Sequence, residues 1–193
     1  MFNKGVSIAI YFFIMFLLSS CVNTRGTYSS HSYSSLSSTP QEELELEPRK
    51  SRPDYALRMP SHINTHEKTI LIDPNVHAFG AYNANGDLIR AGLATAGGHW
   101  CDDVGRACRT RAGTFRIYSL GSAGCKSSIY PLPRGGAPMP YCMFFNGNQG
   151  LHGSPYTVEG NVSHGCVRIT VSDAEWVRFQ FVRPGTKVIV RPY

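Results

Sequence analysis

Two histidines and a cysteine lie close together between residues 152 and 170 of this 193-residue chain. Cys166 could act as a nucleophile, but a free thiol with a pKa of about 8.5 is mostly protonated near neutral pH and needs a base. His152 and His164 are the nearest candidates for that base. Gly165 lacks a side chain, which would let a substrate carbonyl approach the neighbouring backbone N–H groups. These residues favour acyl transfer through a thioester.

The two histidines differ as candidate bases. His164 lies two positions before Cys166, where an extended segment would place both side chains on one face and a glycine turn would separate them. His152 lies on a different segment and can reach the sulfur across the fold, so we prefer it as the base and assign His164 to the pocket wall. A buried structural cysteine with core histidines is the non-catalytic alternative. A zinc hydrolase that uses these three side chains as ligands is another alternative.

The elements that must position these residues are predicted to be mostly strands, because they are short apolar or β-branched runs. The runs cover residues 69–72, 78–83, 88–94, 114–119, 141–145, 167–171 and 187–190. Asn85-Gly86 predicts a tight hairpin turn between the second run and the third. Ser172 and Glu175 fit a capping box, which predicts a short helix that ends before Pro184. The sequence therefore predicts a mainly β protein with one clear helix.

Two loops near the site carry four further cysteines. Residues 100–110 form an irregular loop, and residues 120–140 are rich in glycine and proline and form a long loop or lid. The four residues Cys101, Cys108, Cys125 and Cys142 can pair in three ways. Proximity favours Cys101 with Cys108 and Cys125 with Cys142. Metal ligation is the alternative, but these cysteines lack the paired CxxC spacing of zinc ribbons, so we expect no metal.

The N-terminus has the features of an export signal. Lys4 is followed by an apolar run from Val6 to Leu18, which is shorter than the roughly 20 residues that span a bilayer. Residues 1–20 are therefore predicted to be a signal peptide. The residues that end in Cys21 resemble a bacterial lipobox, in which this cysteine becomes the lipidated first residue; a plain signal peptide with a chance cysteine is the alternative. Val22, in place of an aspartate, favours a periplasmic, lipid-anchored protein of the outer membrane.

The region after Cys21 differs in composition from the rest of the chain. Residues 21–66 are rich in serine and threonine and cannot bury enough apolar surface to offset the entropy lost on ordering, so we predict a flexible linker followed by one domain over residues 67–193. The formal net charge is +6, and the surplus falls in that domain. Bacterial cell wall is a better partner than nucleic acid, because no nucleic-acid motif is present. A solvated basic face is the alternative.

The residues around the site resemble a known signature. Leu151-His152-Gly153, followed by the run SHGCVR from Ser163 to Arg168, resembles the signature of the L,D-transpeptidase family with a YkuD-type catalytic domain. The resemblance extends over roughly residues 68–193 and includes residues 95–98, 110–115, 139–141 and 185–188. It implies a YkuD-like β-sandwich with one or two short helices, here in a lipoprotein form.

The resemblance also implies a role for each site residue. Cys166 matches the nucleophile, His152 matches the base, and the carbonyl of Gly153 matches the group that orients this base. Positions that form the oxyanion pocket or contact substrate are Tyr141, Ser163, His164, Gly165 and Arg168. Arg168 could bind a substrate carboxylate or brace a loop through carbonyl contacts, and we favour the bracing role.

The function implied by the resemblance is a peptidoglycan L,D-transpeptidase that needs no cofactor. Such an enzyme attacks a tetrapeptide stem at meso-diaminopimelate, releases D-alanine and passes the acyl group to an amine on another stem or on a protein. An L,D-carboxypeptidase would give the same thioester to water. A catalytically silent lipoprotein that binds the cell wall is the third interpretation.

Overall fold

The computed structural model describes residues 54–193, and the description below is confined to them. The predicted signal peptide, Cys21 and the linker as far as residue 53 lie outside the described residues. Within residues 54–193, no helix has both the length and the apolar character that crossing a membrane requires.

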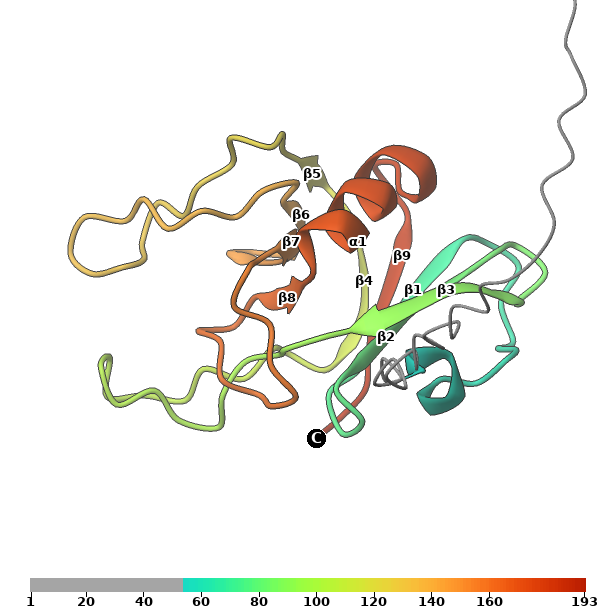
Figure 1. The fold of residues 1–193 in the computed structure, drawn as a ribbon, viewed down its shortest axis with the longest axis horizontal. Coiled ribbons are helices and arrows are strands. Elements are labelled where there is room, and N and C mark those ends of the chain that lie inside the picture. Colours follow the sequence, from blue (N-terminus) through green and yellow to red (C-terminus); the bar gives the residue numbers. More distant parts are fainter. Residues whose placement is uncertain (1–53) are drawn as a thin grey trace, which may run out of the picture. The chain divides into compact units, whose positions relative to one another are not determined.

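Five strands form the first sheet, in the order β3-β2-β1-β9-β4 (Figure 1). Their bounds are β1 Thr69–Asp73, β2 Ala78–Tyr82, β3 Leu88–Leu93, β4 Gly113–Arg116 and β9 Lys187–Val190. β1 and β9 pair in parallel, and the other neighbours are antiparallel. The hairpin between β2 and β3 turns where the sequence predicted it, because Asn83 Oδ1 accepts the backbone N–H groups of Asn85 and Asp87 at 2.9 and 3.0 Å.

Four shorter strands form the second sheet, in the order β5-β6-β7-β8. Their bounds are β5 Ser119–Leu120, β6 Met143–Asn146, β7 Gln149–Gly153 and β8 Val167–Ile169. The strand predicted over residues 114–119 divides here, because β4 belongs to the first sheet and β5 to the second. β7 and β8 pair in parallel and place His152 opposite Arg168. Two separate segments of the predicted site therefore meet on neighbouring strands.

One helical segment follows β8. It consists of the α-helix α1 (Val171–Trp176), which passes directly into the π-helical turn η2 (Val177–Phe181). The N-cap is Thr170, so the predicted cap at Ser172 is wrong by two positions. Thr170 Oγ1 accepts the N–H of Asp173 at 3.1 Å, and Asp173 is held there by an ion pair with Arg90 at 2.9 Å. This cross-chain pair favours the earlier start.

The main hydrophobic core lies between the two sheets and includes the inner face of the helical segment. Its largest side chains are Ile70, Ile72, Phe79, Ile117, Met143, Leu151, Val167, Ile169 and Phe181. In β1, Ile70 and Ile72 face this core, whereas Leu71 faces a second cluster on the other side of the sheet. This alternation follows from the two-residue repeat of a strand and explains why all of β1 is buried.

The packed region begins before the boundary predicted at residue 67. The 3₁₀-helix η1 (Tyr55–Arg58) contacts β2 and β3, and Met59 is buried in the second cluster. The hydroxyl of Tyr82 donates to the carbonyl of Pro60 at 2.9 Å. Residues 54–66 are therefore part of the folded unit and not of a flexible linker. Tyr55, Met59 and Ile63 pack against apolar side chains of the sheet in the second cluster.

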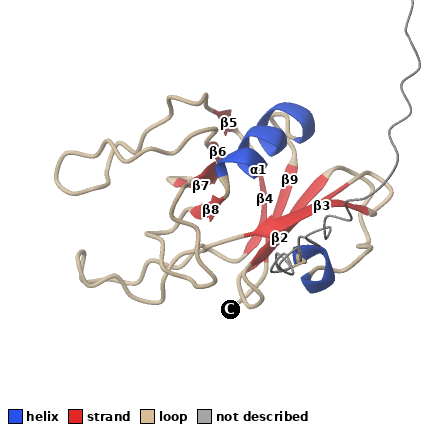
Figure 2. Cartoon of the chain, in the orientation of Figure 1, coloured by secondary structure: helices blue, strands red, loops and turns tan. Residues whose placement is uncertain are grey.

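Two long loops run beside the second sheet, and both are drawn as irregular chain (Figure 2). One connects β3 to β4, and the other connects β5 to β6. Disulfides Cys101–Cys108 and Cys125–Cys142 close a smaller ring within each loop. This is the pairing favoured by proximity in the sequence. The disulfides thereby constrain two loops that have little strand pairing of their own.

Candidate active site

A pocket of about 640 Å³ opens between the second sheet and the two disulfide-containing loops. Residues from both regions line it, including His152, Cys166 and Arg168 from the sheet side and Arg106, Lys126 and Tyr130 from the loops. The structure therefore brings the two predicted catalytic residues, which come from different segments, into one cavity.

The register of β7 and β8 explains how three polar side chains reach this pocket. Leu151 and Val167 are directly paired and buried in the core. Side chains alternate between the faces of a strand, so the next pair, His152 and Arg168, points to the opposite face. Cys166 lies two positions before Arg168 and shares that face. One side of the β7–β8 pair thus builds the core and the other builds the site.

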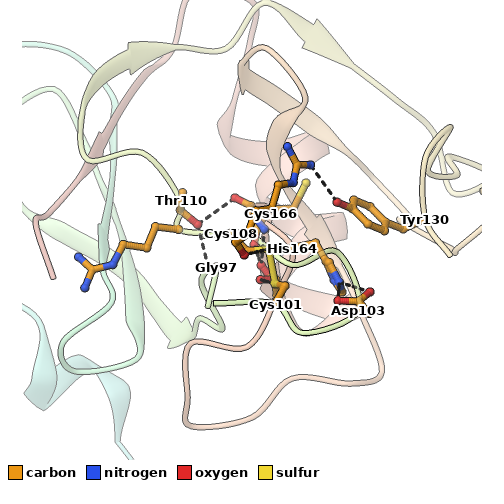
Figure 3. Close-up of a disulfide and its surroundings, with 12 residues drawn as sticks. Gly97, Cys101, Asp103, Cys108, Thr110, Tyr130, His164 and Cys166 are labelled. Carbon is orange, nitrogen blue, oxygen red and sulfur yellow. Dashed lines mark hydrogen bonds and ion pairs between the residues drawn. A yellow bond between two sulfur atoms is a disulfide. The ribbon is translucent and has the colours of Figure 1, made fainter. Parts of the chain in front are cut away.

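A sharp turn holds Cys166 at the start of β8. Gly165 has a φ of 122°, a conformation that a residue with a side chain rarely adopts. The buried hydroxyl of Ser163 accepts the Gly165 N–H at 3.2 Å and donates to the carbonyl of Cys166. Thr110 Oγ1 donates to the Gly165 carbonyl and accepts the Gly97 N–H, each at 2.9 Å (Figure 3). Cys166 is therefore fixed by a hydrogen-bonded turn.

His152 is buried and oriented by its neighbour. Its side chain is 5% exposed, and Nδ1 lies 2.9 Å from the Gly153 carbonyl. A carbonyl only accepts, so Nδ1 carries the proton and the Nε2 of the neutral ring is left as the proton acceptor. Burial lowers the pKa of His152, the Gly153 hydrogen bond opposes this, and the nearby charge of Arg168 lowers it further. The ring is thus kept as a neutral base.

Gly153 also allows the helix to pack closely against the end of β7. A Cβ at this position would lie 3.1 Å from Val171 Cα and 3.2 Å from Ala174 Cβ. The Gly153 N–H donates to the Pro140 carbonyl at 2.8 Å, which ties this strand to the end of the long loop. The residue that orients His152 is consequently fixed on both sides.

Cys166 is the free cysteine among the described residues. Its Sγ lies 3.4 Å from the Asn148 carbonyl, which accepts the thiol hydrogen. Burial raises the pKa of the thiol, while a backbone hydrogen bond from Gly150 and the charge of Arg168 act in the opposite direction. The described state is therefore a neutral thiol beside a neutral imidazole, with the thiol hydrogen directed away from His152.

His164 lies at the edge of the pocket and has different partners. Its Nε2 is 2.7 Å from a carboxylate oxygen of Asp103, and its ring centroid lies 4.3 Å from that of Tyr130 (Figure 3). Arg106 donates to the Tyr130 hydroxyl at 3.3 Å. These contacts join the two disulfide-containing loops to the turn before Cys166. His164 is among the residues that line the pocket.

One group of candidate metal ligands occurs among the described residues. Donor atoms of Cys101, Asp103 and His164 lie within 4.8 Å of one another. The Cys101 sulfur is bonded to Cys108 and so cannot act as a thiolate. The trio of ligands imagined from the sequence, His152 with His164 and Cys166, does not form such a group within residues 54–193.

Tyr141 does not line the pocket within the described structure. Its hydroxyl donates to Glu175 at 3.0 Å, and its ring packs edge-on against Phe179. Its backbone N–H donates to the carbonyl of Ser122 at 2.9 Å. The expected contribution of Tyr141 to the oxyanion pocket thus has no support from this arrangement. Gly165 is also limited as a donor, because Ser163 already accepts its N–H.

Arg168 does not make the side-chain contacts that the favoured bracing role requires. Its backbone N–H and carbonyl exchange hydrogen bonds with Thr95, each at 2.9 Å. Within residues 54–193, its guanidinium forms no hydrogen bond or ion pair, although it lines the pocket. The loop is therefore braced by the backbone of Arg168, and the guanidinium is left facing the cavity.

Several residues that shape the site escaped the sequence interpretation. Asp103 and Tyr130 contact His164, and Thr110 supports the turn before Cys166. Asp103 lies 61 positions from its partner and Thr110 lies 55 positions from Gly165. No local pattern signals such contacts. Only the fold of the two loops brings them together.

Comparison with protein families gives the decisive observation. Residues 67–190 match the family model of the L,D-transpeptidase catalytic domain, YkuD. The chain belongs to this family. Membership agrees with the signature around His152 and Cys166, and it extends over all the strands of this L,D-transpeptidase-type domain.

Solved structures share the fold of this YkuD domain. An L,D-transpeptidase from Xylanimonas cellulosilytica is 24% identical with a TM-score of 0.58, and the match covers 70% of this chain and 67% of that chain. An L,D-transpeptidase from Mycobacterium smegmatis is 23% identical with a TM-score of 0.54, and the match covers 65% and 59%. L,D-transpeptidase 3 from Mycobacterium tuberculosis, in complex with a faropenem-derived adduct, is 21% identical with a TM-score of 0.52 over 65% and 60%.

These similarities confirm the predicted fold class, which is mainly β with two sheets and one short helical segment. The match spans about 60% of the length of the two mycobacterial proteins, which therefore contain regions without a counterpart in the YkuD alignment. The comparison with curated proteins finds no match.

Proposed function

We propose that this protein is a peptidoglycan L,D-transpeptidase that forms a thioester on Cys166. The observation that carries the proposal is the shared pocket, into which a free thiol and an oriented neutral imidazole both open. Family membership supports the same chemistry. A nucleophile, a base and a group that orients the base are the three parts that covalent catalysis of acyl transfer needs.

The proposed reaction begins with a rotation of the thiol away from Asn148. His152 Nε2 then takes the thiol proton while Sγ attacks the carbonyl carbon at the L,D bond of the acyl donor. As the C–N bond breaks, the imidazolium returns the proton to the leaving amine, and the acyl group remains on sulfur as a thioester. An acceptor amine attacks the thioester, its proton passes to His152, and the thiolate is released. The thiolate recovers a proton from the imidazolium.

The developing oxyanion needs donors near Cys166. The Gly165 N–H is engaged by Ser163, so the Cys166 N–H is the better candidate of the two backbone donors proposed from the sequence. Ser163 then acts mainly by holding the turn, and His164 acts by shaping the wall. Both roles follow from contacts to neighbouring residues.

The proposed donor is a tetrapeptide stem of peptidoglycan, and the proposed acceptor is an amine on another stem or on a protein. No aspartate or glutamate is among the residues that line the pocket, whereas Arg106, Arg109, Lys126 and Arg168 are. Stem peptides carry free carboxylates, and a cationic pocket favours such ligands. The chemistry uses only side chains of the chain, so the proposal includes no cofactor.

A β-lactam tests the nucleophile directly, and the faropenem-derived adduct of the similar mycobacterial enzyme makes it a suitable probe. We expect the purified full chain to gain the mass of one carbapenem after incubation, on the peptide that contains Cys166. Cys166→Ala should gain none, and His152→Gln should react far more slowly. A wild-type protein that folds normally and forms no adduct would contradict the proposal.

Product analysis separates this function from its nearest alternatives. With tetrapeptide stems and an acceptor amine, a transpeptidase gives cross-linked product, whereas an L,D-carboxypeptidase gives only the tripeptide and D-alanine. A silent lipoprotein that binds the cell wall gives neither product and binds sacculi equally well with Cys166→Ala. Cross-linked product that depends on both Cys166 and His152 is the result we expect.

We also propose that the protein is exported to the periplasm and anchored to the outer membrane through Cys21. The sequence features are the apolar run before Cys21 and the residue Val22 after it. Residues 1–20 would be removed, and the linker would run from residue 21 to about residue 53. Labelling with a radioactive fatty acid should mark the wild type and not Cys21→Ala. Fractionation of the labelled protein into the inner membrane would contradict the assigned membrane.

A further inference from the structure

Arg168 differs from the other partly buried arginines of the described structure in having no partner for its guanidinium. Arg58 and Arg90 form ion pairs with Glu159 and Asp173, and Arg178 Nε donates to the Gly121 carbonyl at 3.0 Å. Arg168 is half-buried, yet within residues 54–193 its guanidinium has neither an ion pair nor a hydrogen bond. Withdrawing a charge from water without a partner is costly. Such a group suits a site that a ligand anion completes.

The position of Arg168 fixes where that anion would lie. Arg168 is paired with His152 across the β7–β8 ladder and lies two positions after Cys166 on the same face. Two residues along a strand span roughly 7 Å. The guanidinium, the base and the nucleophile therefore surround one small part of the pocket. An anion bound there would lie within about one amino acid of the carbonyl that the sulfur attacks.

The charges around the pocket leave few internal partners for this guanidinium. No aspartate or glutamate is among the described residues that line the cavity, and Asp103, which contacts His164 of the pocket lining, is engaged by that histidine. Arg106 and Lys126 line the loop side, where Arg106 contacts Tyr130. Among the arginines that line the pocket, Arg168 is the one that acts on both Cys166 and His152, and its guanidinium can make a two-pronged pair with a carboxylate.

We propose that Arg168 binds the free carboxylate of the amino acid that leaves the acyl donor. This inference rests on the proposed function. In a tetrapeptide donor the leaving residue is the last one, so its carboxylate is adjacent to the bond that breaks. The pair would hold the scissile carbonyl over Cys166 and would select donors that end at this residue. A donor extended by one residue, or capped as an amide, presents no charge at that place.

The first test uses the thiol alone and needs no transpeptidase activity. Iodoacetate and iodoacetamide alkylate Cys166 by the same displacement of iodide, but only iodoacetate carries a carboxylate. We expect the ratio of the two rates, measured by mass spectrometry of the Cys166 peptide in the full chain, to fall about 10-fold in Arg168→Gln. Arg168→Lys should keep most of the ratio, because it keeps the charge. An unchanged ratio in Arg168→Gln would overturn the proposal.

Arg106→Gln is the matched control for the overall positive electrostatic potential of the pocket. It removes the same charge from the same cavity but from the loop side. We expect its iodoacetate-to-iodoacetamide ratio to stay within about twofold of the wild type, because exposed charges are screened. A fall as large as that in Arg168→Gln would also overturn the proposal, since the effect would then belong to the whole pocket.

The second test uses donors. With the wild type, kcat/KM for a tetrapeptide donor should exceed that for its C-terminal amide by about 10- to 100-fold, and Arg168→Gln should reduce the difference to about twofold. Equal discrimination by both proteins would overturn the proposal. If the wild type turned over neither donor, the proposed function would fail, while the alkylation ratio would still decide the carboxylate site.

A third measurement needs only the wild-type chain, in case Arg168→Gln does not fold. N-acetyl-D-alanine should protect Cys166 from iodoacetamide at concentrations at which N-acetyl-D-alaninamide gives about 10-fold weaker protection. Equal protection by the acid and the amide would count against a carboxylate site beside the thiol.

Discussion

His152 and His164 represent two regions of the pocket that are held in different ways. The floor, which we define as β7, β8 and the turn from Ser163 to Cys166, is fixed by strand pairing and by buried hydroxyls. The rim, defined as residues 101–108 and 125–142, has few ladder contacts and is closed by two disulfides. His152 lies on β7 within the floor, whereas the side chain of His164 extends from the floor turn to contact Asp103 and Tyr130 of the rim.

The difference matters because the two regions differ in their exposure to solvent. In the floor, burial lowers the pKa of His152 and raises that of Cys166, which keeps both neutral. At the rim, His164 and Asp103 meet where both side chains remain partly exposed. A buried group responds strongly to each neighbour, while an exposed ion pair contributes little. We therefore expect chemistry to depend on the floor and substrate access on the rim.

Replacing each of the two histidines separately by glutamine gives the largest expected difference in activity. His152→Gln should lower kcat/KM for peptide donors by about 100- to 10,000-fold, the range for loss of a general base. His164→Gln should lower it by about fivefold or less, because it removes only a partly exposed contact with Asp103 and a ring contact with Tyr130. Steady-state kinetics with a tetrapeptide donor would measure both, with Cys166→Ala as the background. Equal losses would remove the distinction between floor and rim.

Removal of a rim disulfide tests whether the floor is independent of the rim. The double substitution Cys125→Ser with Cys142→Ser opens a loop with a sequence separation of 17 and should lower the free energy of unfolding by about 3 kcal/mol. Urea denaturation would measure this loss. The rate at which iodoacetamide alkylates Cys166 should change by less than about threefold below the transition. A tenfold change would show that the loop also positions the thiol.

A single hydroxyl tests how the floor is braced. Thr110→Val should cost about 1–3 kcal/mol of unfolding free energy, because it leaves the buried Gly97 N–H and Gly165 carbonyl without their partner. Thr110→Ser keeps the hydroxyl and should lose much less. Thermal or urea unfolding of the two variants would compare them. A loss of the same size in both would show that the cost does not come from the two hydrogen bonds of the hydroxyl.

The parts of the fold that the sequence predicted depend on local patterns. The strand over residues 187–190 is predicted with its observed bounds, and the hairpin at Asn85-Gly86 follows from the preference of that pair for tight turns. The predicted cap at Ser172 failed because Asp173 is drawn to Arg90, a residue 83 positions away. The packing of residues 55–66 was also missed, since their apolar partners lie on β2 and β3.

In the candidate site, too, some features follow from local sequence patterns and others depend on the fold. Cys166 and His152 stood out because glycines and histidines cluster near them in the sequence. The sequence left two roles open for the guanidinium of Arg168, and the choice between them depends on which acids lie nearby in three dimensions. The hydrogen bond from the Tyr141 hydroxyl to Glu175 likewise depends on the position of the helix that supplies Glu175. Sequence patterns thus pointed to the predicted nucleophile, whereas the charge balance around it required the fold.

The protonation state of the two floor residues can be tested through the pH dependence of alkylation. Burial raises the pKa of Cys166 and lowers that of His152, so the ring is already a neutral base when the thiol is still protonated. Alkylation of Cys166 by iodoacetamide should therefore rise about tenfold per pH unit from pH about 6 upward, until the pKa of the thiol is reached. The rate would be followed on the Cys166 peptide of the full chain.

A preformed thiolate–imidazolium pair predicts a different profile. Its rate would be nearly constant from mildly acidic to neutral pH and would fall only when the thiolate is protonated. His164→Gln should leave the rising profile unchanged, since His164 is held by Asp103 at the rim. A flat profile in the wild type would show that the two floor residues exchange a proton before substrate binds. A rising profile would show that the thiol is still protonated before substrate binds, so that the proton transfer falls within the reaction.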